Sequence, residues 1–392
     1  MKICIVTNEF PALTETFITT KALELQRRGH EVTVIKNQNT SIVNESHVRQ
    51  VKQAGIKVLS FNDLKTNKDI ARAIFSHPLM VTRSFSSSVT LFKKKFKQLL
   101  QRELLLQSAF DIIHIEFSGL AVAYGSALDH LQAKLVVSCR GTAEKVKPLT
   151  EPNRKVQLRK LFSKVDAIHC VSQDMERTIH PFCDEPAKIF VNRPSIDPQI
   201  FKRSIPYSVN KNTLQILTIG RFTFQKGYLI GLISMHRLKE KGVKFSWKIV
   251  GDGPLKEEII YHIHALQLQD CVELLGKKSR DEILELYNAV HVFLLPSVYE
   301  GIANVCLEAM SMELPVVSTK SGGMEEVIVH GENGLLCEVY DVNSIAENLE
   351  LLTVGTDLIS MGLKARETII DRFTISRQVD VFEAKYSSLI HQ

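Results

Sequence analysis

Two glutamates eight positions apart, Glu300 and Glu308, have the types and spacing best suited to chemistry in this chain. An apolar run over 292–295 predicts a strand that ends at Pro296, and a helical pattern begins near Asn304. Ligands bind at strand carboxyl ends in open α/β sheets, and helix starts favour phosphate. Two carboxylates beside a phosphate would bind something else, and sugar or ribose hydroxyls are the obvious candidates. The simpler alternative is a pair of ordinary acids stabilised by the helix dipole.

A cationic loop, Gly220 to Gly227, follows another apolar run and also opens a helix. Arg221 offers a forked set of N–H donors and Lys226 a point charge, a combination that suits a diphosphate. A solvated loop carrying two cations is the alternative interpretation. The two glycines, and the glutamates expected at the same sheet edge, favour the diphosphate.

Two further glycine turns follow predicted strands. Gly251 and Gly253 lie in a tight turn where backbone can approach a ligand, and Gly322-Gly323 precedes Glu326. Simple turn chemistry explains both turns as well. Neither Gly-x-Gly-x-x-Gly nor a Gly-Lys-Ser/Thr phosphate loop follows a predicted strand, which disfavours dinucleotide and NTP-hydrolysing functions. The sequence also lacks an Asp-x-Asp pair, so we expect no metal site and no obligatory cofactor.

Short apolar strands alternate with amphipathic helices through both halves, which predicts an α/β fold with parallel sheets. A chain of 392 residues fits two domains. We expect Rossmann-like domains over 1–200 and 201–375, and a C-terminal helix, 376–392, that crosses back to the first domain. The predicted strands are 2–7, 31–35, 111–115, 134–138, 167–171 and 188–191, then 214–219, 245–250, 271–274, 292–295, 315–318 and 334–337.

Composition and charge limit the expected cellular location and the expected partners. No apolar run is long enough to span a membrane, and seven scattered cysteines suit a reducing cytoplasm. Residues 1–200 carry 29 Lys and Arg against 19 Asp and Glu, a charge of +10, whereas the remainder carries −4. A predicted helix over 91–106 suits docking on an anionic inner membrane face, although a solvated helix face is an equal alternative. Its cations are Lys93, Lys94, Lys95 and Lys97. We expect no nucleic-acid partner, because no binding motif accompanies the lysines.

The motifs in the second half together resemble the retaining, family-four glycosyltransferases of the GT-B architecture, in which two facing Rossmann-like domains enclose a cleft. The resemblance implies that Arg221 and Lys226 hold the donor diphosphate and that Glu300 contacts the donor sugar. It also implies that Glu308 bonds the ribose. The remaining implied donor-binding positions are the backbone N–H groups of Ile302, Ala303, Asn304 and Val305, with Gly251 and Gly253 in the neighbouring turn.

The first half resembles a narrower branch, the transferases of exopolysaccharide assembly. Arg140, in Ser138-Cys-Arg-Gly-Thr142, stands where the wider family has a histidine that reaches the donor sugar. Arginine cannot act as a base, but it could bind a phosphate or an acidic sugar. Thr14 and Glu15 stand where many relatives have a glycine loop, and helix capping is an equal alternative for them. His114 ends a strand and is a candidate for the acceptor site, although a lone histidine there is more often structural.

The expected function is a metal-independent hexosyltransferase that retains anomeric configuration. It would move a sugar from a nucleoside-diphosphate sugar to a saccharide or lipid-linked acceptor in polysaccharide or glycoconjugate biosynthesis. Two alternatives stay open from the sequence. One is a nucleotide-sugar epimerase of the same architecture, and the other is a non-catalytic sugar-binding protein.

Overall fold

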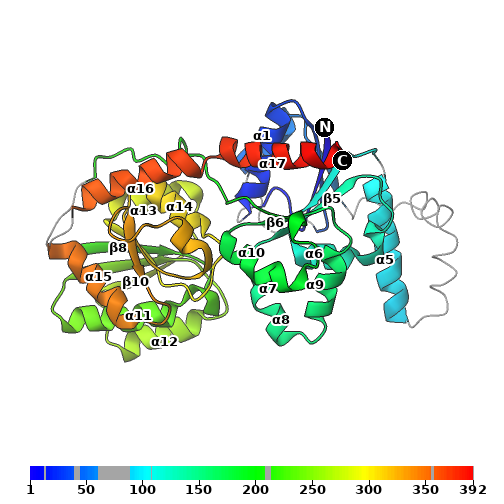
Figure 1. Ribbon diagram of the computed structural model, residues 1–392. Coiled ribbons are helices and arrows are strands. Elements are labelled where there is room, and N and C mark those ends of the chain that lie inside the picture. The colour runs from blue at the N-terminus through cyan, green and yellow to red at the C-terminus, as the bar shows by residue number, and fades with distance from the viewer. Residues whose placement is uncertain are drawn as a thin grey trace. The chain divides into compact units, whose positions relative to one another are not determined.

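The computed structural model describes residues 1–12, 15–38, 45–60, 89–106, 108–207, 213–354 and 357–391 (Figure 1). The backbone alone is described for 89–95 and for residue 354. The chain forms two compact units. The N-terminal unit comprises Met1–Val171, Met175–Asn192 and Gln378–Gln392, and the C-terminal unit comprises Ser172–Asp174 and Arg193–Arg377.

The N-terminal unit is built on a parallel sheet of seven strands in the order β3-β2-β1-β4-β5-β6-β7. Nearly every residue of the central strands is buried, because helices cover both faces of a parallel sheet. The strands are β1 (Lys2–Thr7), β2 (Glu31–Lys36), β3 (Lys57–Ser60), β4 (Ile112–Ile115), β5 (Lys134–Cys139), β6 (Ala167–Cys170) and β7 (Ile189–Val191).

The helices of this unit include one from the far end of the chain. Helix α17 (Ile375–Ile390) lies almost wholly in the N-terminal unit, and its Asp380 and Glu383 each pair with Arg28 at 2.6 Å. The other helices are α1 (Thr16–Arg27), α2 (Glu45–Gln53), α5 (Val89–Leu106), α6 (Ser118–Tyr124), α7 (Thr142–Lys145), α8 (Lys147–Thr150), α9 (Arg154–Phe162) and α10 (Gln173–Ile179), with short 3-10 turns η2 (Gly125–Leu128), η3 (His180–Phe182) and η4 (Pro186–Lys188).

The C-terminal unit contains a six-stranded parallel sheet in the order β10-β9-β8-β11-β12-β13. Alternate residues of β11 enter two separate cores, with Val292 and Leu294 in one and Phe293 and Leu295 in the other. Both faces of the strand are therefore buried, which explains its unbroken apolar sequence. The strands are β8 (Leu214–Ile219), β9 (Phe245–Val250), β10 (Val272–Gly276), β11 (Val292–Leu295), β12 (Val316–Thr319) and β13 (Gly334–Cys337).

Helices cover this second sheet and begin directly after its strands. They are η5 (Phe224–Lys226), α11 (Tyr228–Glu240), α12 (Lys256–Ala265), α13 (Arg280–Ala289), α14 (Asn304–Ser311), η6 (Gly322–Glu326), α15 (Val342–Val354) and α16 (Leu358–Arg372). Helices α13 and α16 start on side-chain caps, in which Ser279 and Asp357 accept backbone N–H bonds. Helix α14 has no side-chain cap, which leaves its first N–H groups available.

The predicted α/β fold with two parallel sheets is confirmed. The sequence did not predict the edge strand β3, and the observed units divide after Asn192 instead of after residue 200. Strand order reverses between β1 and β4 in one sheet and between β8 and β11 in the other. Ligands of open α/β sheets bind at such reversal points, so the loops after these four strands are the places to look for a site.

Candidate active site

Lys226 and Glu300 come from the two loops that flank the strand reversal of the C-terminal sheet, and they touch. Lys226 Nζ lies 2.6 Å from Glu300 Oε1. Ser297 Oγ donates to the same oxygen at 2.9 Å, and Gln225 Nε2 donates to Oε2 at 3.1 Å. Glu300 is buried, so these donors replace the water that its carboxylate would otherwise need. The predicted convergence of the cationic loop and the first glutamate is present in the structure.

Glycines allow these loops to come close together. A Cβ on Gly227 would lie 1.9 Å from the carbonyl oxygen of Pro296, and a Cβ on Gly251 would lie 1.9 Å from that of Gly220. Gly227 also has φ +63°, a left-handed conformation that side chains disfavour. The backbone N–H of Val298 donates to Gln225 O at 2.8 Å and ties the two loops together. The glycines therefore have a packing role, whether or not Gly251 and Gly253 contact a ligand.

The start of α14 presents unpaired backbone donors beside Glu300. Within the described part of the chain, the N–H groups of Ile302, Ala303, Asn304 and Val305 donate no hydrogen bond. Arg221 is exposed and forms no ion pair with any described residue. Amides at a helix start and a free guanidinium both suit an anion.

Glu308 lies one turn into α14 and is half-buried. The hydroxyl of the buried Tyr287 donates to Glu308 Oε2 at 3.1 Å. Burial raises the pKa of Glu308 to about 7, although the Tyr287 hydrogen bond and the charge of Arg280 lower it. Two oxygens with one protein donor leave acceptor capacity for a diol. The C-terminal unit thus combines anion-binding donors with two carboxylates that can accept hydroxyl hydrogen bonds.

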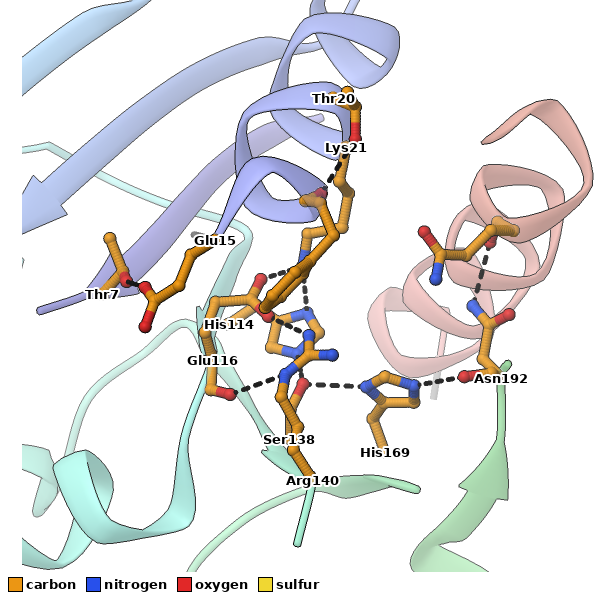
Figure 2. A network of polar contacts seen from close by, with 12 residues as sticks. Thr7, Glu15, Thr20, Lys21, His114, Glu116, Ser138, Arg140, His169 and Asn192 are labelled. Carbon is orange, nitrogen blue, oxygen red and sulfur yellow. Dashed lines mark hydrogen bonds and ion pairs between the residues drawn. The ribbon is translucent and has the colours of Figure 1, made fainter. Parts of the chain in front are cut away.

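A second polar cluster lies at the strand reversal of the N-terminal sheet (Figure 2). Glu116, which follows β4, is fully buried and is shared by two cations. Lys21 of α1 pairs with its Oε1, and Arg140 Nη2 lies 2.5 Å from its Oε2. Burial opposes ionisation, but the charges of Lys21 and Arg140 hold the pKa of Glu116 well below its usual range. This carboxylate therefore stays charged.

A series of hydrogen bonds between uncharged side chains adjoins that cluster. His169 Nε2 lies 2.7 Å from Asn192 O, which can only accept, so this nitrogen carries the proton. Burial lowers the pKa of His169 to about 3, so the ring is neutral and its Nδ1 carries no proton. Ser138 Oγ therefore donates a hydrogen bond to His169 Nδ1, at 2.8 Å. Ser138 Oγ then accepts from His114 Nε2 at 2.7 Å, and His114 Nδ1 accepts from Tyr386 at 2.5 Å.

His114 is therefore a structural residue of the interior, and the prediction that it contacts an acceptor is wrong in this structure. Its side chain has no exposed surface, and both ring nitrogens are bonded within the protein. Burial, followed by the charge of Lys21, lowers its pKa well below the usual value, so it stays neutral. The structural alternative recognised from the sequence is the one that the geometry supports.

Two protein-family models match the chain, and they meet at residue 200. Residues 14–200 match the model described as Glycosyltransferase Family 4, and residues 201–358 match the model described as Glycosyl transferases group 1. The two models follow each other along the chain. The chain belongs to the family-four glycosyltransferases.

Named relatives and solved structures agree with this assignment. The glycosyltransferase is 26% identical to the amylovoran biosynthesis glycosyltransferase AmsK of Erwinia amylovora, over 95% of this chain and 96% of the relative. It is also 26% identical to N-acetyl-alpha-D-glucosaminyl L-malate synthase of Bacillus anthracis, over 76% of this chain and 78% of that protein.

Two solved structures establish the GT-B architecture. Anabaena HepE, in complex with UDP and glucose, superposes with a TM-score of 0.74 at 18% identity, over 99% of this chain and all of that one. Sucrose-phosphate synthase of Thermosynechococcus elongatus superposes with a TM-score of 0.77 at 14% identity, over 100% of this chain and 99% of that one.

The structure describes only some of the remaining predicted positions of the glycosyltransferase. Glu15 begins α1 without capping it, because its side chain bonds no N–H of the helix. Thr14 lies outside the described residues, as do the side chains of Lys93, Lys94 and Lys95, whereas Lys97 is exposed. No helix in the described ranges is long and apolar enough to cross a membrane.

The sequence analysis missed several residues that contact the predicted site residues, because the two members of each pair lie far apart in the sequence. Lys21 and Glu116 pair across 95 positions, and Tyr386 reaches His114 across 272. Tyr287, which supports Glu308, lies within an unremarkable helical pattern. Glu116 alone carried a signal, since an acid directly after an apolar strand stands at a sheet edge. Glu326 accepts N–H bonds from Gln173 and Asp174 and pairs with Arg193, contacts to distant parts of the sequence that the turn pattern did not predict.

Proposed function

We propose that this glycosyltransferase moves a sugar from a nucleoside-diphosphate sugar to a saccharide or lipid-linked acceptor in polysaccharide biosynthesis. The observation that carries the proposal is the meeting of Lys226 and Glu300 at the uncapped start of α14. Lys226, Arg221 and the α14 amides are suited to the diphosphate. Glu300 is suited to sugar hydroxyls and Glu308 to ribose hydroxyls.

Cleavage of the donor develops negative charge on the β-phosphate as the nucleotide leaves. Preorganised cations and helix amides stabilise that charge in the transition state, and one such donor typically contributes about 3–4 kcal/mol. Lys226 is held in place by its contact with Glu300, and the amides by the helix, so they need little reorganisation. We propose retention of anomeric configuration by front-face displacement, and no obligatory divalent metal, as family membership suggests.

Names of related proteins support the nature of the donor and of the product. HepE was crystallised with UDP and glucose, and AmsK is named for amylovoran biosynthesis. We therefore propose a UDP-sugar as the first donor to test and a growing saccharide as the acceptor.

We also propose a peripheral association with an anionic membrane surface, on the inner face. The predicted lysines of α5 lie mostly outside the described side chains, but a second basic surface is described. Leu149 of α8 is 80% exposed and Val156 of α9 is 65% exposed. Exposed Lys155 and Lys160 flank Val156 on α9 and form no ion pair with a described residue. Exposed apolar groups among cations suit an anionic leaflet.

The test is incubation of the full chain with a panel of nucleotide-sugars while nucleotide release is followed, with and without membrane extract as acceptor. Release that depends on the acceptor supports transfer. An isomerised nucleotide-sugar without acceptor would support the epimerase alternative instead. Binding without turnover, in the presence of a competent acceptor, would support a non-catalytic sugar-binding protein.

A further inference from the structure

We propose that Arg140 and Glu15 form a recognition site for an acidic sugar residue of the acceptor, with Lys21 and Glu116 positioning the Arg140 guanidinium. The inference rests on the proposed function, because it assigns the acceptor to the N-terminal unit. Arg140 follows β5, and Glu15 begins the helix after β1, so both belong to the strand-reversal edge of this sheet.

The Arg140 guanidinium is held by Glu116 through two of its three nitrogens. Its Nε donates to Glu116 O at 3.1 Å and its Nη2 to Glu116 Oε2 at 2.5 Å. Its carbon Cζ lies 4.2 Å from the ring centroid of Phe17, which restrains the plane of the fork. Nη1 donates no hydrogen bond to any residue in the described ranges. The Arg140 side chain keeps 16% of its surface exposed, whereas the Glu116 carboxylate that holds it is fully buried.

Within the group of Glu116, Lys21 and Arg140, one positive charge is in excess. Glu116 carries one negative charge and contacts two cations, Lys21 and Arg140. His114 and His169 are neutral, because burial lowers the pKa of both. Lys21 is buried and pairs with Glu116, and its Nζ also lies 3.4 Å from His114 Nδ1. Of the two cations, Arg140 is the one with exposed surface, and Glu15 is the nearby acid at the same sheet edge.

Glu15 determines which anion suits this edge. Its carboxylate lies within electrostatic reach of Arg140 and accepts a bond from Thr7 Oγ1 at 3.4 Å, leaving capacity for hydroxyl donors. A nearby carboxylate disfavours a doubly charged phosphate more than a singly charged carboxylate. A uronic acid residue offers a carboxylate for the Arg140 fork and hydroxyls for Glu15. We therefore assign the ligand as a sugar carboxylate.

The direct test compares two probes that differ only in charge, methyl β-D-glucuronide and methyl β-D-glucoside. Their binding to the full chain, with UDP present, is titrated by ligand-observed NMR. The wild type should bind the glucuronide about tenfold more tightly, since a charge-assisted bidentate pair is lost with the glucoside. Arg140→Gln should abolish the preference, and Arg140→Lys should weaken it because the fork is lost. Arg177→Gln, at an exposed arginine of α10, is the matched control and should keep it.

The positioning role is tested by replacing the buried pair. Glu116→Gln leaves Lys21 uncompensated and could unfold the unit, whereas the double variant Lys21→Met with Glu116→Leu removes both charges together. Replacing a buried ion pair with apolar residues is often neutral for stability. The double variant should keep the circular dichroism spectrum and the glucoside affinity but lose about tenfold in glucuronide affinity. An unchanged preference in the folded double variant would overturn the positioning role.

Three further outcomes separate the claims. Equal affinity of the wild type for both methyl glycosides would overturn the acidic-sugar site. Tighter binding of glucose 1-phosphate than of the glucuronide would also overturn it and assign the edge to phosphate. A glucuronide preference in a protein that binds no UDP would sustain this site and contradict the proposed donor function instead.

Discussion

Tyr386 of the last helix and His114 of the central strand β4 form one hydrogen bond, with 2.5 Å between Tyr386 Oη and His114 Nδ1. Both side chains are fully buried. The bond is the first of a series that runs through Ser138 and His169 to the backbone of Asn192. Because the last acceptor is a carbonyl, each proton in the series has a single possible position.

Tyr386→Phe should therefore destabilise the protein by about 1–3 kcal/mol, because it removes the hydroxyl donor from a buried nitrogen. Urea unfolding followed by circular dichroism measures the loss. Tyr340→Phe, at a 59% exposed tyrosine, is the control and should change stability by no more than about 0.5 kcal/mol. Equal stabilities for the two variants would contradict the inferred series.

Lys226→Ala and Glu308→Ala should each weaken donor binding and turnover without unfolding the protein. Loss of one preorganised donor typically lowers turnover about 100- to 1,000-fold, so the Lys226 variant should fall in that range. UDP affinity by calorimetry and nucleotide release provide the measurements. Lys241→Ala, at a surface ion pair of the same unit, is the control. Unchanged nucleotide affinity in both site variants would refute the assignment.

Donor affinity should depend on pH through Glu308. Its pKa is raised to about 7 by burial, and ribose hydroxyls donate best to the ionised carboxylate. Below pH 7 the proton must leave before the diol binds, so affinity should fall by up to about tenfold per pH unit. Calorimetry with UDP-glucose between pH 5.5 and 8.5 tests this, because its diphosphate does not titrate in that range. Glu308→Gln should bind weakly with a flat profile, and a sloping profile in that variant would exclude Glu308 as the cause.

The close approach of the two active-site loops should make Gly227 intolerant of substitution. Gly227→Ala places a methyl group against the Pro296 carbonyl at a residue with left-handed backbone conformation. We expect the free energy of unfolding to fall by more than about 3 kcal/mol. Gly242→Ala is the matched control in the same unit. Gly242 is also left-handed, with φ +78°, but a Cβ there meets nothing within 4 Å. We therefore expect its free energy of unfolding to fall by only about 1 kcal/mol. Comparable melting temperatures would contradict the steric argument.

Membrane association should depend on the exposed surface of α8 and α9. The double variant Leu149→Glu with Lys155→Glu removes one apolar contact and reverses one charge. We expect at least a fivefold drop in co-sedimentation with vesicles of phosphatidylglycerol and phosphatidylcholine, at about 1 kcal/mol per cation. Leu363→Glu with Lys364→Glu on α16 is the control, because Leu363 is 54% exposed in the other unit. Equal losses in both variants would show that charge alone, and not this surface, governs binding.

The sequence predicted the parts of this molecule that depend on local patterns. Apolar runs such as 214–219 and 292–295 gave strands with the same bounds, because parallel strands buried on both faces need continuous apolar sequence. The strand β3 was missed, since Lys57-Val-Leu-Ser60 is a short edge segment without such a run.

The C-terminal site was predictable because each of its parts follows a strand, and strand ends meet at one edge. The N-terminal cluster was not predictable in the same way. Lys21 lies within a helix, and nothing in its neighbourhood indicates that it is buried against Glu116. His114 looked equally suited to a ligand site and to the core. Its hydrogen bonds to Ser138 and Tyr386, which the sequence does not indicate, show that it belongs to the core.

The bond from Asn192 Nδ2 to Gln378 O, 2.9 Å long, joins the residue after which the chain passes into the main segment of the C-terminal unit to the residue at which it returns. That unit is consequently discontinuous, and its last segment supplies Phe382 and Tyr386 to the interior around His114 and His169. A fragment that stops at residue 192 lacks part of its own core. The N-terminal unit is therefore complete only after the ribosome has finished the C-terminal unit.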